Sequence, residues 1–360
     1  MQRSQQLSRA FKAVIARTLL RKPEYWARAM RRRAMPVLCY HRVCDEPDPL
    51  GLAVSPPEFA QQMRLLADSS HVRPVSATEF ARIWHGQCAY GTRVPVLVSF
   101  DDGFRDNLTV VAPALRRHGV PAILFVTTDV LAGMAPWYDL IERLVSSGRE
   151  DALRAALAST GLAPPDGAAP RGASAWVALL MGLPGARFEN AIAAVRVLGE
   201  PQHADGRYLS ETDLKDWHAQ GFEVGAHTCT HARLSSLNAR QAHWEMSESK
   251  ARLEALLGHP VSLFAYPFGG RADFTSAHSR ALAEIGFDMA FTTIQGGNRV
   301  TDDPFTVRRK CVQTGLFSRP GRAFSESLFM ADLMGLGADL RQGLHQALRP
   351  TPRAGAASGG

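Results

Sequence analysis

The 360-residue sequence contains no uninterrupted apolar stretch long enough to cross a bilayer, which takes about 20 residues. Its start also lacks the apolar core of a signal peptide, because Lys12, Arg17 and Arg21 interrupt the only candidate segment. From these two absences we expect a cytoplasmic protein.

Cysteine is scarce, with five residues at spacings that match no zinc or redox motif. An odd number of cysteines argues against a disulfide framework of the kind that stabilises small secreted domains. We expect buried, unpaired thiols at these positions, which are Cys39, Cys44, Cys88, Cys229 and Cys311.

The net positive charge of the chain comes entirely from its first 35 residues. Residues 1–35 carry ten Lys and Arg against one Glu, a net charge of about +9, whereas the whole chain has +7 and its remainder is near −2. A nearly neutral body argues against a nucleic-acid partner. Residues 1–35 are predicted to be a basic arm or helix that could contact the inner membrane face peripherally. A solvated helix or a disordered arm is the alternative.

The sequence does contain a regular alternation of strand-like and helix-like segments. Short apolar runs rich in β-branched residues alternate with segments whose apolar residues recur at helical spacing. This alternation is typical of an α/β protein with a parallel sheet. The expected strands are 34–41, 94–100, 122–127, 222–226, 261–266, 289–292 and 305–312, and the expected helices are 57–66, 78–84, 107–117, 210–219, 239–257 and 275–285.

Residues 134–207 break this alternation. Their middle part, 158–172, is rich in Pro, Gly and Ala and indicates a loop, with helical stretches at 140–145 and 189–198 on either side. We interpret 134–207 as an insertion in a domain that spans 36–316. Residues 317–360 are expected to form a C-terminal tail that is partly disordered.

Two pairs of polar residues follow strand-like runs. Asp101 and Asp102 end the run 94–100, and His227 and His231 follow the run 222–226. One carboxylate and two imidazoles are a common ligand set for a catalytic zinc ion, and a second carboxylate beside them can act as a base. The sequence therefore predicts a metal-dependent hydrolase. Cys229, between the two histidines, is a less favoured alternative ligand.

Other candidates also follow strands. His41, the segment 266–270 and Arg309 all come at or near predicted strand ends. Because sites in barrels and open α/β sheets gather at the C-terminal ends of strands, these residues are expected at the same rim as the carboxylates.

Three segments resemble the first three motifs of the polysaccharide deacetylases, the NodB-like carbohydrate esterases of family four. They are Ser99-Phe100-Asp101-Asp102-Gly103-Phe104, His227-Thr228-Cys229-Thr230-His231 and Ala265-Tyr266-Pro267-Phe268-Gly269. The resemblance implies a distorted (β/α) barrel of the NodB-like, seven-stranded type, here with a helical and loop insertion. It also implies metal-dependent removal of acetyl groups from sugar polymers.

The same resemblance assigns roles to the motif residues. Asp101 corresponds to the general base, and Asp102, His227 and His231 correspond to the ligands of Zn²⁺ or another divalent transition metal. The backbone N–H of Phe268 stands where the family has a donor to the oxyanion. A backbone donor explains why Phe can replace the usual Tyr there.

The sequence departs from the family pattern at two places. Ala265 stands where the third motif usually opens with an arginine that holds the base, and Arg309 could supply that cation from another strand; a surface arginine is the alternative. The late motif that carries the general acid is not evident. His41 instead resembles the acid histidine on the N-terminal strand of the circularly permuted branch, with a structural histidine as the alternative. The family's Asp-x-x-Asp-Trp motif is not found.

Together these features predict a hydrolase of carbon–nitrogen bonds that removes N-acetyl groups from an amino-sugar-containing polysaccharide or glycolipid precursor. One alternative is the same metal site acting on an O-acetyl ester or a non-sugar amide. Others are a non-catalytic glycan-binding homologue and a membrane-docked assembly factor. Trp137, Tyr138 and Asp139 begin the insertion, where an aromatic ring could stack on a sugar, although core packing is favoured.

Overall fold

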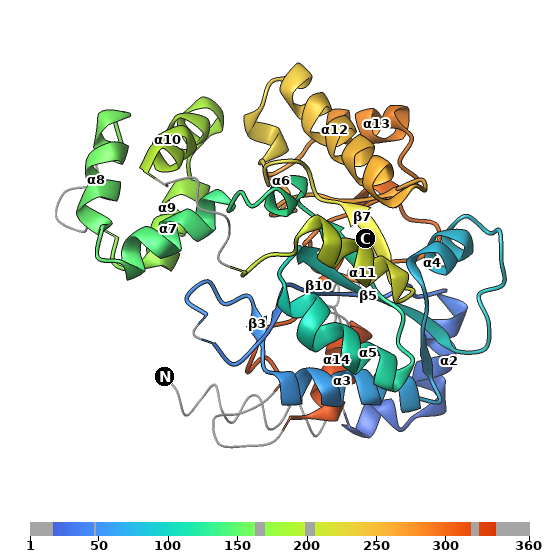
Figure 1. Ribbon diagram of the computed structural model, residues 1–360. Helices are drawn as coiled ribbons and strands as arrows, with labels where there is room; N and C mark the ends of the chain where they lie inside the picture. Colours follow the sequence, from blue (N-terminus) through green and yellow to red (C-terminus); the bar gives the residue numbers. More distant parts are fainter. Residues whose placement is uncertain (1–16, 47, 163–169, 199–205, 318–323, 336–360) are drawn as a thin grey trace, which may run out of the picture.

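The computed structural model describes residues 17–46, 48–162, 170–198, 206–317 and 324–335 (Figure 1). Residues 1–16 lie outside this part of the chain, so the predicted membrane contact of the basic N-terminus stays a prediction, as does the character of residues 336–360. Within the described ranges, no helix combines the length and the apolar character that crossing a membrane requires.

A curled parallel sheet forms the centre of the protein. Its strands lie in the order β10 (Lys310–Cys311), β1 (Val37–Tyr40), β5 (Val94–Asp102), β6 (Ile123–Val126), β7 (Glu223–Ala226), β8 (Leu263–Ala265) and β9 (Met289–Phe291), with β4 (Val72–Pro74) also beside β5. All these pairings are parallel. A separate pair consists of β2 (Arg42–Val43) and β3 (Ala53–Val54).

One late segment connects the two edges of this sheet. Val307 forms a parallel bridge with Phe291 of β9, and Lys310 and Cys311 then pair with Leu38 and Cys39 of β1. The sheet therefore curls back on itself, and the distorted (β/α) barrel predicted from the sequence is confirmed. Its strands are only two to nine residues long.

Helices cover the outside of the sheet (Figure 1). These are α2 (Pro23–Arg31), α3 (Pro56–Asp68), α4 (Ala77–Trp84), α5 (Ala112–His118), α6 (Thr128–Leu131), α11 (Glu211–Ala219), α12 (Ala239–Leu257), α13 (Ser276–Ile285) and α14 (Glu326–Leu333), with short turns at η1 (Asn107–Val111), η2 (Leu234–Ser236) and η3 (Pro304–Thr306). Between β6 and β7 the chain adds α7 (Trp137–Ser146), α8 (Glu150–Ser159), α9 (Ala173–Met181) and α10 (Gly185–Leu198), which gather beside the barrel in Figure 1.

The alternation of side chains along β5 positions the site. Val96, Val98 and Phe100 pack with the surrounding helices, whereas Leu97 belongs to a second apolar cluster that fills the barrel interior. Because successive side chains of a strand point to opposite faces, Asp101 continues the interior row that starts at Leu97. A carboxylate is thus delivered to the interior at the C-terminal end of the strand.

Several expected elements differ from those observed. The strand expected at 305–312 is wrong in its first half, where Pro304 opens a 3₁₀ turn, and only Lys310–Cys311 forms a ladder. The helix expected at 107–117 begins with the π turn η1. Pro113 lacks an N–H group and so cannot continue the regular hydrogen-bond ladder there. Helix α4 begins one residue before the expected start at 78, and Ser76 caps it by accepting the Glu79 N–H.

Candidate active site

Asp101 and Arg309 form a buried ion pair inside the barrel. Arg309 Nη1 and Nη2 lie 2.7 Å from Asp101 Oδ1 and Oδ2 respectively, and Arg309 is completely buried. Nε and Nη1 of Arg309 also donate to Thr292 O (3.0 Å) and Ser99 Oγ (3.3 Å). Burial by itself would raise the pKa of Asp101, but the charge and hydrogen bonds of Arg309, together with the nearby His227 and His41, outweigh burial and hold that pKa below its usual value. The carboxylate is therefore ionised, as a general base must be.

Asp102, His227 and His231 converge next to this ion pair. All three are buried, and their candidate ligand atoms lie within 4.8 Å of one another. Asp102 Oδ1 is 3.5 Å from His227 Nε2 and 3.2 Å from His231 Nε2. Register explains the meeting, because Asp102 pairs with Val126 of β6 and Val126 pairs with Ala226, the residue before His227. Burial lowers the pKa of His231, which favours the neutral imidazole that binds metals.

The three residues fit a divalent metal ion. His227 Nδ1 lies 2.8 Å from Ala265 O, and since a carbonyl only accepts, Nδ1 carries the proton and Nε2 keeps a free lone pair. Such a second partner is the usual way to fix a metal-binding imidazole. Asp102 Oδ1, between the two imidazoles, is buried without a hydrogen-bond partner among the described residues. A cation bound there would satisfy this oxygen.

The backbone at the site takes a conformation that non-glycine residues rarely adopt. Asp102, Thr228, His231 and Phe268 have φ angles of +75°, +63°, +55° and +61°. Four of the five described non-glycine residues with positive φ thus belong to the three motif segments. Residues held in this region cluster at active sites, where the surrounding structure imposes the conformation.

Glu245 on α12 holds the histidine loop, and sequence reasoning missed it. Its carboxylate accepts hydrogen bonds from the N–H groups of Cys229 and Thr230 at 2.8 and 3.0 Å and from the Thr230 hydroxyl at 2.7 Å. The Cys229 thiol points away to Glu245 O at 3.8 Å and is not part of the ligand cluster. The structure thus does not support Cys229 as an alternative ligand.

Replacing Glu245 with alanine should lower the free energy of unfolding by about 3 kcal/mol, because the buried Cys229 N–H and the partly buried Thr230 N–H lose their partner. We would measure urea denaturation of chelator-treated protein. Glu248→Ala is the control, since Glu248 lies one turn further along α12, pairs only with Arg252 at a partly exposed position, and should change stability by less than about 1 kcal/mol. Equal midpoints for the two variants would contradict this role of Glu245.

His41 and Cys39 lie close to Asp101. Candidate ligand atoms of Cys39, His41 and Asp101 are within 4.8 Å of one another, and the Cys39 thiol donates to Asp101 Oδ2 at 3.5 Å. His41 is half-buried, and its backbone carbonyl accepts from Asn107 Nδ2 at 2.9 Å. The structure therefore brings His41, Asp101 and the metal-type cluster to the same end of the barrel.

Phe268 lies at the rim beside His231. The two rings have centroids 4.7 Å apart, and the Thr293 hydroxyl donates to Phe268 O. The Phe268 N–H donates no hydrogen bond to any residue that the structure describes. All seven residues singled out from the sequence therefore gather in one place, and the Phe268 amide is free to donate to a ligand.

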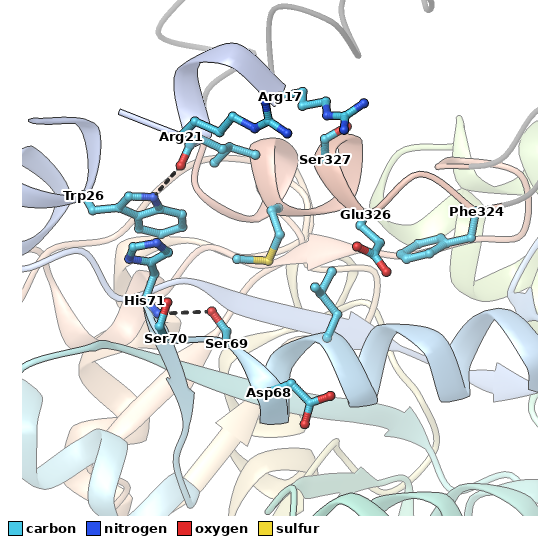
Figure 2. Close-up of a pocket in the computed structure, with 13 residues that line it drawn as sticks. Arg17, Arg21, Trp26, Asp68, Ser69, Ser70, His71, Phe324, Glu326 and Ser327 are labelled. Carbon is cyan, nitrogen blue, oxygen red and sulfur yellow. Dashed lines mark hydrogen bonds between the residues drawn. The ribbon is translucent and has the colours of Figure 1, made fainter. Parts of the chain in front are cut away.

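A separate cavity of about 710 Å³ lies between α2, α3 and α14 and shares no residue with this site (Figure 2). Trp26 stacks on His71 along its wall with centroids 4.3 Å apart, and Arg17, Arg21 and Glu326 line it. Its described lining contains no cluster of the Asp-His-His type. Both groups of candidate metal ligands among the described residues lie at the end of the barrel and not in this cavity.

Comparisons with known proteins agree with this site. The family model for polysaccharide deacetylase matches residues 193–290, a segment that includes both histidines and the third motif. The Bacillus subtilis (strain 168) protein named "Putative polysaccharide deacetylase YxkH" is 20% identical over 303 residues, which cover 84% of this chain and 80% of that protein.

Two solved structures share the fold. The Streptococcus pyogenes deacetylase PplD in complex with acetate has a TM-score of 0.56 at 17% identity and covers 83% of this chain and 98% of its own. IcaB from Ammonifex degensii has a TM-score of 0.53 at 23% identity and covers 84% of this chain and 97% of its own. Residues 193–290 are therefore similar to the polysaccharide deacetylase family, and the chain shares the fold of PplD and IcaB.

Proposed function

We propose that this protein is a metal-dependent deacetylase that removes N-acetyl groups from an amino-sugar-containing polysaccharide or glycolipid precursor. The observation that carries the proposal is the buried cluster of Asp102, His227 and His231 beside an ionised, arginine-held Asp101. Asp102, His227 and His231 would hold a divalent ion, which would supply a nucleophile at neutral pH and polarise the acetyl carbonyl. The solved PplD structure, which contains acetate, is consistent with deacetylation.

Asp101 is the proposed general base. Its two oxygens are fixed by Arg309, so the carboxylate cannot rotate away. Oδ2 also accepts from the Cys39 thiol, whereas Oδ1 accepts only from Arg309 among the described residues and keeps a lone pair for a proton. The carboxylate takes a proton from the attacking water as the new bond to the acetyl carbon forms. General-base catalysis of this kind contributes about 10²- to 10⁴-fold in rate.

The N–H of Phe268 is the proposed protein donor to the oxyanion. Its position follows from the positive φ of Phe268 and from the fixed Phe268 carbonyl, which accepts from Thr293. A preorganised donor of this kind stabilises the negative charge that develops on the acetyl oxygen without any reorganisation. Because the group is a backbone amide, the ring is free to pack against His231 and Trp137.

His41 is the proposed general acid. It lies within 4.8 Å of Asp101, as measured between candidate ligand atoms, and is half-buried, so it can reach both substrate and solvent. It gives a proton to the leaving nitrogen, which releases acetate and a free amine on the sugar. An amine is a poor leaving group unless it is protonated, whereas an alcohol needs less help from an acid.

His41→Ala should therefore lower N-acetyl hydrolysis by about 10²- to 10⁴-fold while an O-acetyl ester is still cleaved at a rate near that of the wild type. The measurement is acetate release from paired N-acetyl and O-acetyl sugar substrates, with metal content determined on the same samples. His243→Ala, an exposed histidine on α12, is the control. Full N-deacetylase activity in His41→Ala would remove His41 from the mechanism.

The direct test of the function is acetate release from a panel of N-acetylated oligosaccharides, measured beside elemental analysis of the purified protein. We expect one equivalent of a divalent transition metal and release from at least one amino-sugar polymer. A protein that binds the oligosaccharides and carries metal, yet releases no acetate, would instead be the non-catalytic glycan-binding homologue.

A further inference from the structure

The start of α7, which belongs to the insertion, packs against His231 and Phe268 of the site. Trp137 lies 5.9 Å from Phe268 and Tyr138 lies 5.2 Å from His231, as distances between ring centroids. Asp139 is 1% exposed, and it accepts from Arg143 Nε at 2.8 Å and from Arg207. Two arginines therefore fix the helix start, and with it the direction of the Tyr138 side chain.

Tyr208 reaches the same place from the segment that follows the insertion. Phe104 and Tyr208 form an antiparallel bridge, and their rings stack with centroids 4.8 Å apart. The Leu209 N–H donates to Gly103 O at 2.9 Å. Residues 207–209 are thus paired with the chain directly after Asp102, which leaves Tyr208 little freedom to move.

Both phenol groups are buried without a hydrogen-bond partner among the described residues. Tyr138 is 5% exposed and Tyr208 is 4% exposed, and neither hydroxyl makes a hydrogen bond. Asp102 Oδ1 and His231 Nδ1 are also unpartnered. A buried hydroxyl without a partner is costly, so an accumulation of such groups around one carboxylate indicates a site completed by a ligand.

Both phenols lie near Asp102. The Tyr138 ring is 5.2 Å from that of His231, whose Nε2 is 3.2 Å from Asp102 Oδ1, and Tyr208 pairs with Phe104, two residues after Asp102. Burial raises the pKa of Tyr138, and the charge of Asp102 and that of Tyr208 raise it further. Burial also raises the pKa of Tyr208, with Asp139 and Asp102 adding to it. A phenol ordinarily has a pKa of about 10, so each hydroxyl is protonated at neutral pH and can act as a hydrogen-bond donor.

We propose that Tyr138 is a positioning residue that donates a hydrogen bond to the Asp102 carboxylate when that carboxylate binds the metal, and that Tyr208 donates to Tyr138 in turn. The inference rests on the metal site of the proposed function. It gives the insertion a role in the chemistry, because α7 then supplies the outer partner of the only carboxylate in the Asp102, His227, His231 cluster. Outer partners of this kind orient a metal ligand, and their loss costs about 10- to 100-fold in metal affinity.

The test is the affinity of the purified full chain for Zn²⁺ and Co²⁺, measured by competition with a chromophoric chelator. We expect Tyr138→Phe to weaken both affinities by about 10- to 100-fold and Tyr208→Phe to weaken them less. The visible spectrum of the Co²⁺ form should change in Tyr138→Phe, because the geometry around the ion depends on how Asp102 is held.

Tyr90→Phe is the matched control. The Tyr90 hydroxyl is also largely buried, but it donates to Ala34 O at 2.6 Å, and Tyr90 packs in the interior cluster with Phe80 and Trp84. This variant should lose thermal stability and keep the wild-type affinity for both metals. Tyr138→Phe should show the reverse, because removing an unpartnered hydroxyl does not weaken the metal-free protein.

Wild-type metal affinity and an unchanged Co²⁺ spectrum in Tyr138→Phe would overturn the inference and would assign Tyr138 to packing alone. That result would leave the proposed function intact if the wild-type chain binds metal and releases acetate. Failure of the wild-type chain to bind either ion would instead count against the proposed function itself. The two failures are therefore distinguished by the wild-type sample.

Discussion

Replacing Asp102 with asparagine is expected to abolish acetate release, with a loss of about 10³-fold or more in kcat/KM. The carboxylate is the only negative ligand in the cluster, and the ion it holds is worth several kcal/mol of charge stabilisation in the transition state. Asparagine is the appropriate substitution, because Asp102 has φ +75° and asparagine tolerates this conformation better than alanine. The variant should therefore lose the charge and keep the backbone.

The measurement combines acetate release with thermal unfolding. A metal present at 100 times its Kd stabilises the folded wild type by about 2.7 kcal/mol, so added Zn²⁺ should raise the wild-type Tm and leave that of Asp102→Asn unchanged. Asp216→Asn, an exposed position on α11, should behave as the wild type in both experiments. Metal-dependent acetate release by Asp102→Asn at the wild-type rate would exclude this carboxylate as a ligand.

The main features of the site were predictable because parallel strands place their C-terminal ends at one rim. Asp101 and Asp102 end β5, and His227 follows β7, which lies two strands away in the sheet. An apolar run that stops at a polar pair can be recognised locally in the sequence. The parallel sheet then brings the polar residues of such runs to one rim. The structure also places Arg309 against Asp101. From the sequence alone, Arg309 could equally have been a surface residue.

Other parts of the fold left no adequate signal in the sequence. The strands β2, β3 and β10 have two residues each, too few for a period-two pattern to be recognised. Helices α8 and α9 were not separated from the loop between them, because Ala and Gly occur throughout that stretch. Helix α14 lies in the segment that we expected to be a tail, and its Phe329 and Met330 are buried. A short run of four apolar residues does not by itself predict a packed helix.

The residues that support the site could not be predicted for a different reason. Glu245 follows Thr230 by fifteen residues, and Tyr138 lies almost a hundred residues before His231. Neither belongs to a motif, and each works only through a contact made after folding. Sequence patterns report strand ends and helix faces, whereas the outer partners of a site depend on tertiary packing.

Arg309→Met is expected to destabilise the protein by about 3–5 kcal/mol and to depress turnover with metal content unchanged. Methionine fills a similar volume but removes the charge and both hydrogen bonds to Asp101. Asp101 is then left as an uncompensated buried charge. Without Arg309, burial should raise the pKa of Asp101, and the acid limb of the kcat/KM profile should move to higher pH. Wild-type turnover in this variant would remove Arg309 from the site.

The stability difference between wild type and Arg309→Met should itself depend on pH. In the wild type the pKa of Asp101 is lowered on folding, so the ion pair stabilises the protein above the unfolded pKa of about 4 and this stabilisation is lost as pH falls through the folded value. In the variant the same carboxylate has a raised pKa, and its protonation relieves the buried charge. Urea denaturation of chelator-treated protein at pH 7 and pH 5 should therefore show a smaller difference at pH 5.

The double variant Asp101→Asn/Arg309→Met separates the two roles of this ion pair. Removing both charges should restore most of the stability, because no unpaired charge remains inside the barrel. It should not restore activity, since the base itself is gone and about 10²- to 10⁴-fold in kcat is lost with it. Activity that recovered together with stability would mean that Asp101 and Arg309 serve the fold alone, and the general base would have to be sought elsewhere.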